Sequence, residues 1–239
     1  DIFIAKLNAD GSYAWATQSG GSKDDTGFGI TSLSDGSAIV TGYFQGTTSF
    51  GGTTLRSAGD KDIFIAKLNT DGSYAWATQA GGSGWDSGND ITSLSDGSAI
   101  VSGEFEGTAS FGGTTLRSAG GYDIFIAKLN ADGSYAWATQ AGGSDWDRGY
   151  GITSLSDGSS IVTGSFQGTA SFGGTTLRSA GDQDIFIAKL NADGTWDTTP
   201  PDPPTTDTTT PDVNDGKAAF TISGTPAVGQ TLSATKTAD

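Results

Sequence analysis

The chain has 239 residues, of which 38 are Gly, and it contains no Cys, His or Met. These absences exclude a disulfide framework, zinc sites built from Cys and His, a thiol nucleophile and a histidine general base. The formal net charge of -15 argues against nucleic acid as a partner, because phosphate backbones need a basic surface.

The sequence also shows no apolar run long enough to cross a membrane and no signal peptide, so we expect no membrane insertion of this segment. Position 1 is Asp rather than Met. We therefore expect the sequence to be a processed product or a piece of a longer polypeptide.

A segment beginning DIFIAKLN opens the chain and returns at Asp62, Asp123 and Asp184. In the three full copies, 47 of 61 positions are identical. A period of this length indicates repeat architecture. The predicted repeat region, 1–194, divides into three full copies and a partial one: 1–61, 62–122, 123–183 and 184–194.

Within the first copy the pattern predicts four strands in chain order: DIFIAKLN, SYAWATQ, FGITSLS and SAIVTGYFQG. Asp10-Gly11 is the signal of a type I′ hairpin turn, and Asp35-Gly36 supplies a second Asp-Gly turn. The stretch TTSFGGTTLRSAGDK is interpreted as a Gly-rich excursion between strands. Four antiparallel strands at fixed spacing predict an all-β, β-propeller-like array; a linear stack of small antiparallel sheets is the alternative.

Large aromatic residues recur at equivalent places in the copies. Because a single four-stranded sheet cannot bury two apolar faces alone, we expect neighbouring copies to bury each other. The residues predicted to form this structural core are Trp15, Trp76, Trp137, Phe44, Phe105 and Phe166.

The strings GGSKDDTGFGI, SLSDGSAIVTGYFQG and DIFIAKLNADG resemble the bacterial seven-bladed β-propeller-type surface repeat, abbreviated SBBP. The resemblance covers residues 1 to about 194 and implies a propeller fold in a secreted or cell-surface protein. It implies no catalytic residues. The chain departs from the family in blade number, since its copies make an incomplete ring. Either upstream repeats of the same polypeptide or other copies of the chain are expected to supply the missing strands.

Beyond the repeats, residues 195–215 are rich in Pro and Thr and are predicted to be a stiff, extended linker. Residues 216–239 contain FTISGTPAVGQTLSA, which resembles the start of a bacterial Ig-like surface repeat but is too short for that domain. This order of segments is typical of a long adhesin-type surface protein.

Calcium is the one cofactor that the sequence allows. Asn8–Ser12 places oxygen-bearing side chains at alternate positions, but Asp-Gly also serves a plain turn, which we favour. The metal candidates are Asp25, Asp86 and Asp147, one in each copy. The other interpretation is that each of these aspartates fixes its loop by accepting backbone N–H groups.

Fourteen positions differ among the three copies, and seven of them fall in two loops expected on one face of a propeller. Three more alternate along one strand, which predicts an exposed and a buried side. The ligand-binding candidates on this variable face are Phe28, Trp85, Tyr122, Trp146, Tyr150, Tyr43 and Glu104. Aromatic rings beside polar groups suit stacking on sugars, whereas drift of duplicated copies would also concentrate changes in loops.

No set of residues predicts a catalytic centre. The sequence therefore predicts a non-catalytic, extracellular structural or adhesive module of a large bacterial surface protein, in an oligomeric or filamentous assembly. The alternative is a lectin-type propeller that binds surface polysaccharide through the variable loops.

Overall fold

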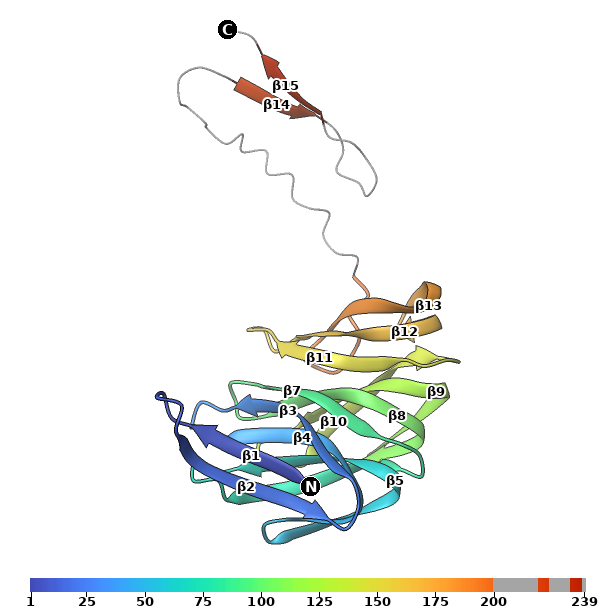
Figure 1. The fold of residues 1–239 in the computed structure, drawn as a ribbon. Coiled ribbons are helices and arrows are strands. Elements are labelled where there is room, and N and C mark those ends of the chain that lie inside the picture. Colours follow the sequence, from blue (N-terminus) through green and yellow to red (C-terminus); the bar gives the residue numbers. More distant parts are fainter. Residues whose placement is uncertain (200–218, 224–232, 238–239) are drawn as a thin grey trace. The chain divides into compact units, whose positions relative to one another are not determined.

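The computed structural model describes residues 1–199, 219–223 and 233–237, which divide between two units, Asp1–Thr198 and Thr199–Asp239. Every regular element in these residues is a β-strand (Figure 1). The strands are β1 Ile2–Leu7, β2 Tyr13–Gly21, β3 Asp25–Ser32, β4 Ala38–Phe50, β5 Thr53–Leu68, β6 Tyr74–Gly82, β7 Ser87–Ser93, β8 Ala99–Phe111, β9 Thr114–Leu129, β10 Tyr135–Gly143, β11 Arg148–Ser154, β12 Ser160–Phe172, β13 Thr175–Leu190, β14 Ala219–Ser223 and β15 Ser233–Thr237.

In the second unit, β14 and β15 form an antiparallel pair. Most of the predicted linker, 195–215, and most of the predicted Ig-like segment, 216–239, lie outside the described residues. The first unit extends past residue 194, because Trp196 packs edge-on against Phe172 and bridges Leu190.

The thirteen strands from β1 through β13 are hydrogen-bonded into one antiparallel sheet. The sheet does not close on itself. Within it, β3 pairs with β4, β4 with β5 and β5 with β6. The same order recurs in β7–β10 and, for three strands, in β11–β13. These groups are connected by short pairings, β2 with β4, β6 with β8 and β10 with β12.

The Gly-rich stretch expected to be an excursion is instead part of two long strands. β4 runs on to Phe50 and β5 starts at Thr53, so the two form a hairpin arm beyond a bulge after Gln45. Phe50 is buried and packs against the Phe64 ring at 4.9 Å. The prediction was wrong because one buried aromatic residue holds an otherwise polar, Gly-rich arm in register.

The turn at Asp10-Gly11 is also not type I′. Gly11 has φ of 83°, but no described residue other than Gly has positive φ, as a type I′ turn would require at Asp10. The Gly11 N–H donates to the Asn8 carbonyl at 3.0 Å, and the Asn8 N–H donates to the Ser12 carbonyl at 2.8 Å. This is a type I turn closed by a Gly bulge.

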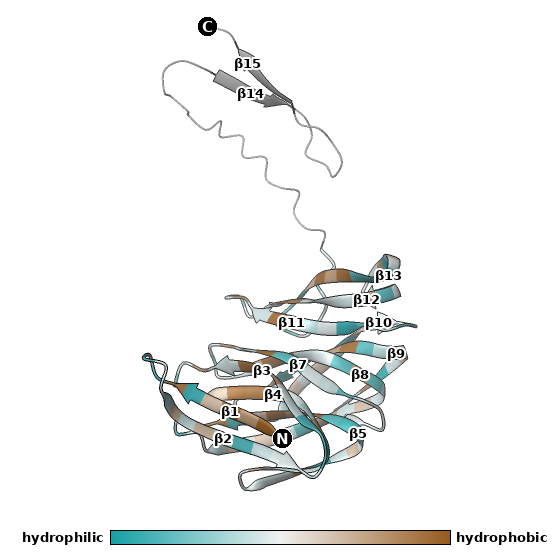
Figure 2. Cartoon of the chain, in the orientation of Figure 1, coloured by the Kyte–Doolittle hydropathy of each residue, from teal (hydrophilic) through white to brown (hydrophobic). Residues whose placement is uncertain are grey.

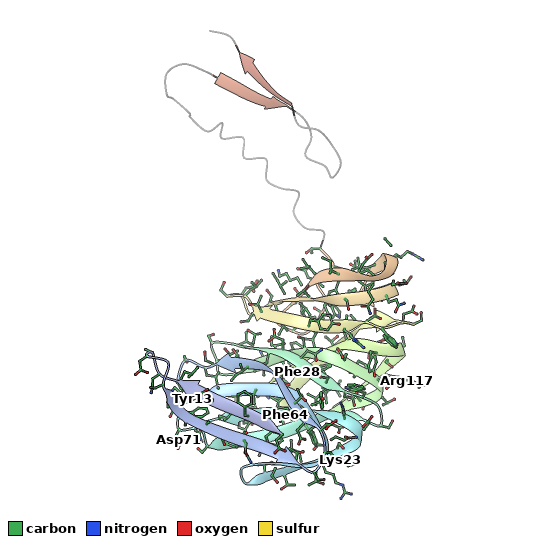
Figure 3. The ribbon with its side chains drawn as sticks, viewed as in Figure 1. Tyr13, Lys23, Phe28, Phe64, Asp71 and Arg117 are labelled. Carbon is green, nitrogen blue, oxygen red and sulfur yellow. The ribbon has the colours of Figure 1, made fainter. Side chains whose placement is uncertain are left out.

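The recurring DIFIAKL segment is buried on both faces in the middle of the array. Ile63, Phe64, Ile65 and Ala66 are each at most 1% exposed. Figure 2 shows the hydrophobic stretches of such strands, and Figure 3 shows Phe64 among the packed strands. Three hydrophobic clusters lie between successive strand groups, and each combines residues from both neighbours.

The aromatic residues predicted for the core differ in burial. Phe44, Phe105 and Phe166 are buried. The tryptophans Trp15, Trp76 and Trp137 are only partly buried and pack against the edges of the three clusters. The Trp76 indole N–H donates to the Ala131 carbonyl at 3.2 Å and so links neighbouring groups.

The expectation that the variable strand positions mark an exposed side fails at Thr41 and Ser102, which are both fully buried. A Cβ placed on Gly88 would lie 2.2 Å from the Thr41 hydroxyl, so β7 packs tightly on that side of β4. Both sides of the strand are covered there, because the next group of strands lies against it.

The first strands of successive groups, β3, β7 and β11, lie side by side (Figure 1) and are joined by side chains rather than by a backbone ladder. The Thr31 and Ser93 hydroxyls are 3.3 Å apart, and those of Thr92 and Ser154 are 3.2 Å apart. The Asp90 carboxylate accepts the Ile152 N–H at 2.9 Å.

Candidate binding surface

Five aromatic residues from three copies form a continuous row that we call the aromatic ladder: Phe28, Tyr43, Trp85, Tyr122 and Trp146. Successive ring centroids lie 5.7, 6.4, 6.3 and 6.1 Å apart along this row. All five residues occupy positions at which the copies differ. The structure therefore brings together most of the ligand-binding candidates predicted from the sequence.

The strands fix the ladder at each step. Phe28 lies on β3 (Figure 3) beside the bulge between Gly27 and Gly29. Trp85 precedes β7 and forms a parallel bridge with Lys61 on β5. The following Asp86 N–H donates to the Lys61 carbonyl at 2.8 Å. The backbone that carries the indole is therefore fixed to the neighbouring strand β5.

The backbone beside Trp146 is held by the equivalent hydrogen bond, in which the Asp147 N–H donates to the Tyr122 carbonyl at 2.8 Å. The ladder thus crosses from one group of strands to the next at each tryptophan.

Two cations are inserted between the rings. The Lys61 ammonium lies 4.0 Å from the Tyr43 centroid and 4.2 Å from the Trp85 centroid. The Arg148 guanidinium lies 5.3 Å from the Tyr122 centroid and 5.5 Å from that of Trp146. Such contacts contribute on the order of 1 kcal/mol each, so they stiffen the ladder.

Glu104 occupies the place in its copy that Tyr43 has in the first. Its carboxylate lies 3.8 Å from Arg148 and accepts a hydrogen bond from the Asn89 amide at 2.8 Å. Burial raises the pKa of Glu104. Tyr150 also interacts with Arg148. Glu104 and Tyr150, two of the predicted ligand candidates, therefore contact the cation that lies between the Tyr122 and Trp146 rings.

The rings keep a large part of their area open. Trp85 is 39% exposed, Trp146 51% and Phe28 55%. Tyr43 and Tyr122 are half-buried between them. Neighbouring rings are tilted or edge-on, so the ladder offers separate ring faces rather than one flat platform. Such faces can stack on the apolar side of a sugar ring.

Each metal candidate accepts backbone N–H groups. The carboxylates of Asp25, Asp86 and Asp147 accept the N–H of the residue four positions earlier, at 2.9, 2.7 and 2.7 Å. The second oxygen of Asp86 accepts the Glu106 N–H at 3.2 Å, and that of Asp147 accepts the Gln167 N–H at 3.2 Å. That of Asp25 accepts the Thr48 hydroxyl at 2.6 Å. These bonds fix the loops that carry Trp85 and Trp146.

In the part of the chain that the structure describes, no group of three or more Asp, Glu, His or Cys side chains lies close enough to hold a metal ion. In the Asn8–Ser12 turn, the Asp10 carboxylate accepts both the N–H and the hydroxyl of Ser12, at 3.0 and 2.6 Å. These bonds lower the pKa of Asp10.

Two further carboxylates, Asp62 and Asp123, are buried beside Asp86 and Asp147 and were not predicted from the sequence. A Cβ placed on Gly81 would lie 2.9 Å from Asp62 Oδ1 and 2.8 Å from Asp86 Oδ2, so the two carboxylates converge there. The Oδ1 atoms of Asp62 and Asp123 are buried without a hydrogen-bond partner. The signal available in the sequence was an Asp that opens every DIFIAKL segment.

Burial raises the pKa of Asp62 to about 6. Burial and the nearby Asp62 and Glu106 carboxylates raise the pKa of Asp86 to about 7. Burial, with the nearby Asp147, raises the pKa of Asp123 to about 7. At neutral pH each pair therefore holds protons that isolated carboxylates would have released.

Two segments of the chain, 111–134 and 171–199, match the model of a β-propeller domain of unknown function (DUF5122). They cover the end of β8 with β9 and its turn, and the end of β12 with β13 and the residues after it. No curated protein matches the chain. Together with the open antiparallel sheet, the match supports a β-propeller-type repeat. Among the described residues no helix is long and apolar enough to cross a membrane.

Proposed function

We propose that the chain is a non-catalytic, extracellular adhesive module and that its aromatic ladder is the surface that contacts carbohydrate. The observation that carries the proposal is the convergence of the variable positions of neighbouring copies into one row of exposed rings. Drift alone predicts variation in loops but does not predict that the varied residues contact one another across copies.

The proposal includes a repeat of 61 residues in which each blade has four antiparallel strands. The pairing orders of β3–β6 and of β7–β10 support it. The resemblance to SBBP surface repeats supports placement at the bacterial cell surface. In such an array the loops before β7 and β11 emerge on the same face, where the ladder lies.

Carbohydrate suits this surface for two chemical reasons. The protein is strongly acidic, which disfavours nucleic acid and other polyanions. The tryptophan and phenylalanine rings of the ladder are 39–55% exposed, so their faces can stack on the apolar side of sugar rings.

The test is a titration of soluble neutral polysaccharides (dextran, mannan and xylan) followed by tryptophan fluorescence. We expect a saturable change that is lost in the double variant Trp85→Ala/Trp146→Ala. The matched control is Tyr13→Ala, which removes an exposed aromatic residue outside the ladder and should leave binding unchanged. No response to any of the three glycans, or a response that survives the double variant, would reject the ladder as the contact surface.

A further inference from the structure

The β13 end of the first unit leaves uncovered the residues that are buried at the same places elsewhere in the chain. Ile185 is 80% exposed and Ile187 is 71% exposed. Their equivalents in the two preceding copies are at most 1% exposed: Ile63, Ile65, Ile124 and Ile126. Thr163 on β12 is likewise exposed, whereas its equivalents Thr41 and Ser102 are fully buried.

The structure shows what covers these places in the preceding copies. β9 pairs along its outer edge with β10, from Ile124 opposite Ala141 to Leu129 opposite Tyr135. The face of Ile124 packs against β11, where a Cβ on Gly149 would lie 3.2 Å from its side chain. Among the described residues, no strand pairs with the outer edge of β13 from Ile185 to Ala188 or packs on the exposed side of Ile185 and Ile187. Within this part of the chain only Trp196 and Asp197 pair with that edge, at Leu190 and Lys189, because after Gly194 the sequence is TWDTTPPDPP in place of the SYAWATQAGG of earlier copies. A strand that pairs along all of β13 must therefore displace these two residues.

The β1 end of the first unit also leaves uncovered a residue that is buried in the other copies. β1 pairs with β2 alone, and Phe3 is 82% exposed although its equivalents Phe64, Phe125 and Phe186 are buried. A groove of about 160 Å³ lies here between β1, β3 and β4, lined by residues that include Phe28 and Val40. In the next group, β4 occupies the corresponding place, with Thr41 against Gly88.

Residues 1–7 and 184–190 have the same sequence, DIFIAKL. A β13 strand placed on β2 of another molecule would therefore repeat the existing β1 register, in which Ile2 faces Ser19 and Ile4 faces Thr17. Ile185 and Ile187 would take the places of Ile2 and Ile4, which are already buried. The attached β12 would enter the groove beside β3.

We propose that this chain associates head to tail by strand replacement, with β13 of one copy displacing β1 from β2 of a second copy. We expect β13 to bind β2 more stably than β1 does, because β13 is already paired with β12. Among the described residues β1 pairs with β2 alone. The contact joins two different surfaces, so repetition produces an open chain or a closed ring. The proposal does not depend on carbohydrate binding by the ladder.

The first test is the native mass of the 239-residue chain by light scattering over a range of concentrations. We expect multiples of 24.1 kDa that collapse to the monomer in Ile185→Asp/Ile187→Asp. Both substitutions change exposed side chains, so the variant should fold. The control Leu155→Asp, at an exposed turn residue, should still associate. A chain that is monomeric at every concentration overturns the proposal.

The second test fixes the register. In β1–β2 pairing Ala5 faces Ala16, so strand replacement puts Ala188 opposite Ala16 of the second copy. Because the chain has no Cys, the variant Ala16→Cys/Ala188→Cys should form intermolecular disulfides on oxidation. The control Ala16→Cys/Ala180→Cys places the thiols out of register and should not. Equal crosslinking in both variants, or assembly that persists in Ile185→Asp/Ile187→Asp, contradicts strand replacement.

Discussion

Tyr74 and Tyr135 occupy equivalent places in two copies, but their hydroxyls have different surroundings. The Ser19 hydroxyl donates to the Tyr74 hydroxyl at 2.6 Å. The Tyr135 hydroxyl is buried without a hydrogen-bond partner, and Ala80 stands where Ser19 does in the first copy. A buried polar atom without a partner costs more than a satisfied bond gains. The change from Ser19 to Ala80 therefore leaves the Tyr135 hydroxyl without the hydrogen bond that the Tyr74 hydroxyl has.

The variant Ala80→Ser should supply the missing partner and raise the free energy of unfolding by about 1 kcal/mol. The reciprocal variant, Ser19→Ala, should lower it by a similar amount. Urea denaturation measures both. Adding Tyr135→Phe to Ala80→Ser should cancel the gain; an equal gain without the tyrosine hydroxyl would show that this hydrogen bond is not its source.

The paired aspartates should make the stability of the protein depend on pH near neutrality. The folded-state pKa values of Asp62, Asp86 and Asp123 are about 6, 7 and 7, all above the ordinary value. The folded state therefore binds more protons than the unfolded state between about pH 4 and about pH 7. The stability contributed by these groups is full below the ordinary pKa and is lost as the pH rises through 6 to 7.

We expect the melting temperature to rise as the pH falls from about 8 to about 5. The variant Asp62→Asn/Asp123→Asn should flatten this slope, because one member of each pair no longer titrates. Aspartates whose pKa values are lowered, such as Asp10 and Asp71, act in the opposite direction but only at more acidic pH. A melting temperature that decreases as the pH is lowered from about 8 to about 5 contradicts the assigned protonation.

Each Gly-rich hairpin arm contributes a buried aromatic residue to the hydrophobic core. Phe111 ends the β8 side of one arm, is buried, and contacts the rings of Phe105, Phe125 and Tyr135. Phe50 and Phe172 hold the corresponding places in the other two arms. One aromatic residue for each arm thus attaches a Gly-rich hairpin to the sheet.

The variant Phe111→Ala should reduce the free energy of unfolding by about 3–5 kcal/mol, since it opens a cavity among three aromatic rings. Tyr13→Ala, at a residue 72% exposed on β2, should change it by less than about 0.5 kcal/mol. Chemical denaturation compares the two. Similar losses in both variants would show that the arm contributes little to folding.

The strands that the sequence predicts best are those with an uninterrupted apolar run. The apolar run in DIFIAKL predicts burial on both faces, and Ile63, Phe64 and Ile65 are buried. The arms escape prediction because GTTSFGGTTLRS is indistinguishable from a loop until the contacts of Phe50 are known. The bulged turn at Asp10-Gly11 depends on backbone angles that the dipeptide alone does not determine.

The site was predictable to a similar extent. Variation among copies pointed to Trp85, Tyr122 and Trp146, because those positions change while most packing residues do not. It did not reveal the insertion of Lys61 and Arg148 between rings, since the two cations come from different positions of the repeat. Contacts between copies follow from the packing of successive groups and cannot be read from one copy.

The strands of the first unit form an open array in which most interior residues are identical among the copies, while the varied aromatic residues gather on one surface. Identical packing residues let each group bury the next. The varied residues are then free to form the ladder without loss of the core. The proposed function rests on the surface that these varied aromatic residues form.

The most direct measurement is the set of six tryptophan indole N–H signals in an ¹H–¹⁵N NMR spectrum, recorded with and without a polysaccharide from the fluorescence panel. Trp85 and Trp146 lie in the ladder, whereas the indoles of Trp15, Trp76 and Trp196 donate to backbone carbonyls elsewhere. We predict that the glycan shifts the Trp85 and Trp146 signals and leaves those three in place. Shifts confined to the other tryptophans, or no shift with any glycan, would contradict a carbohydrate-binding ladder.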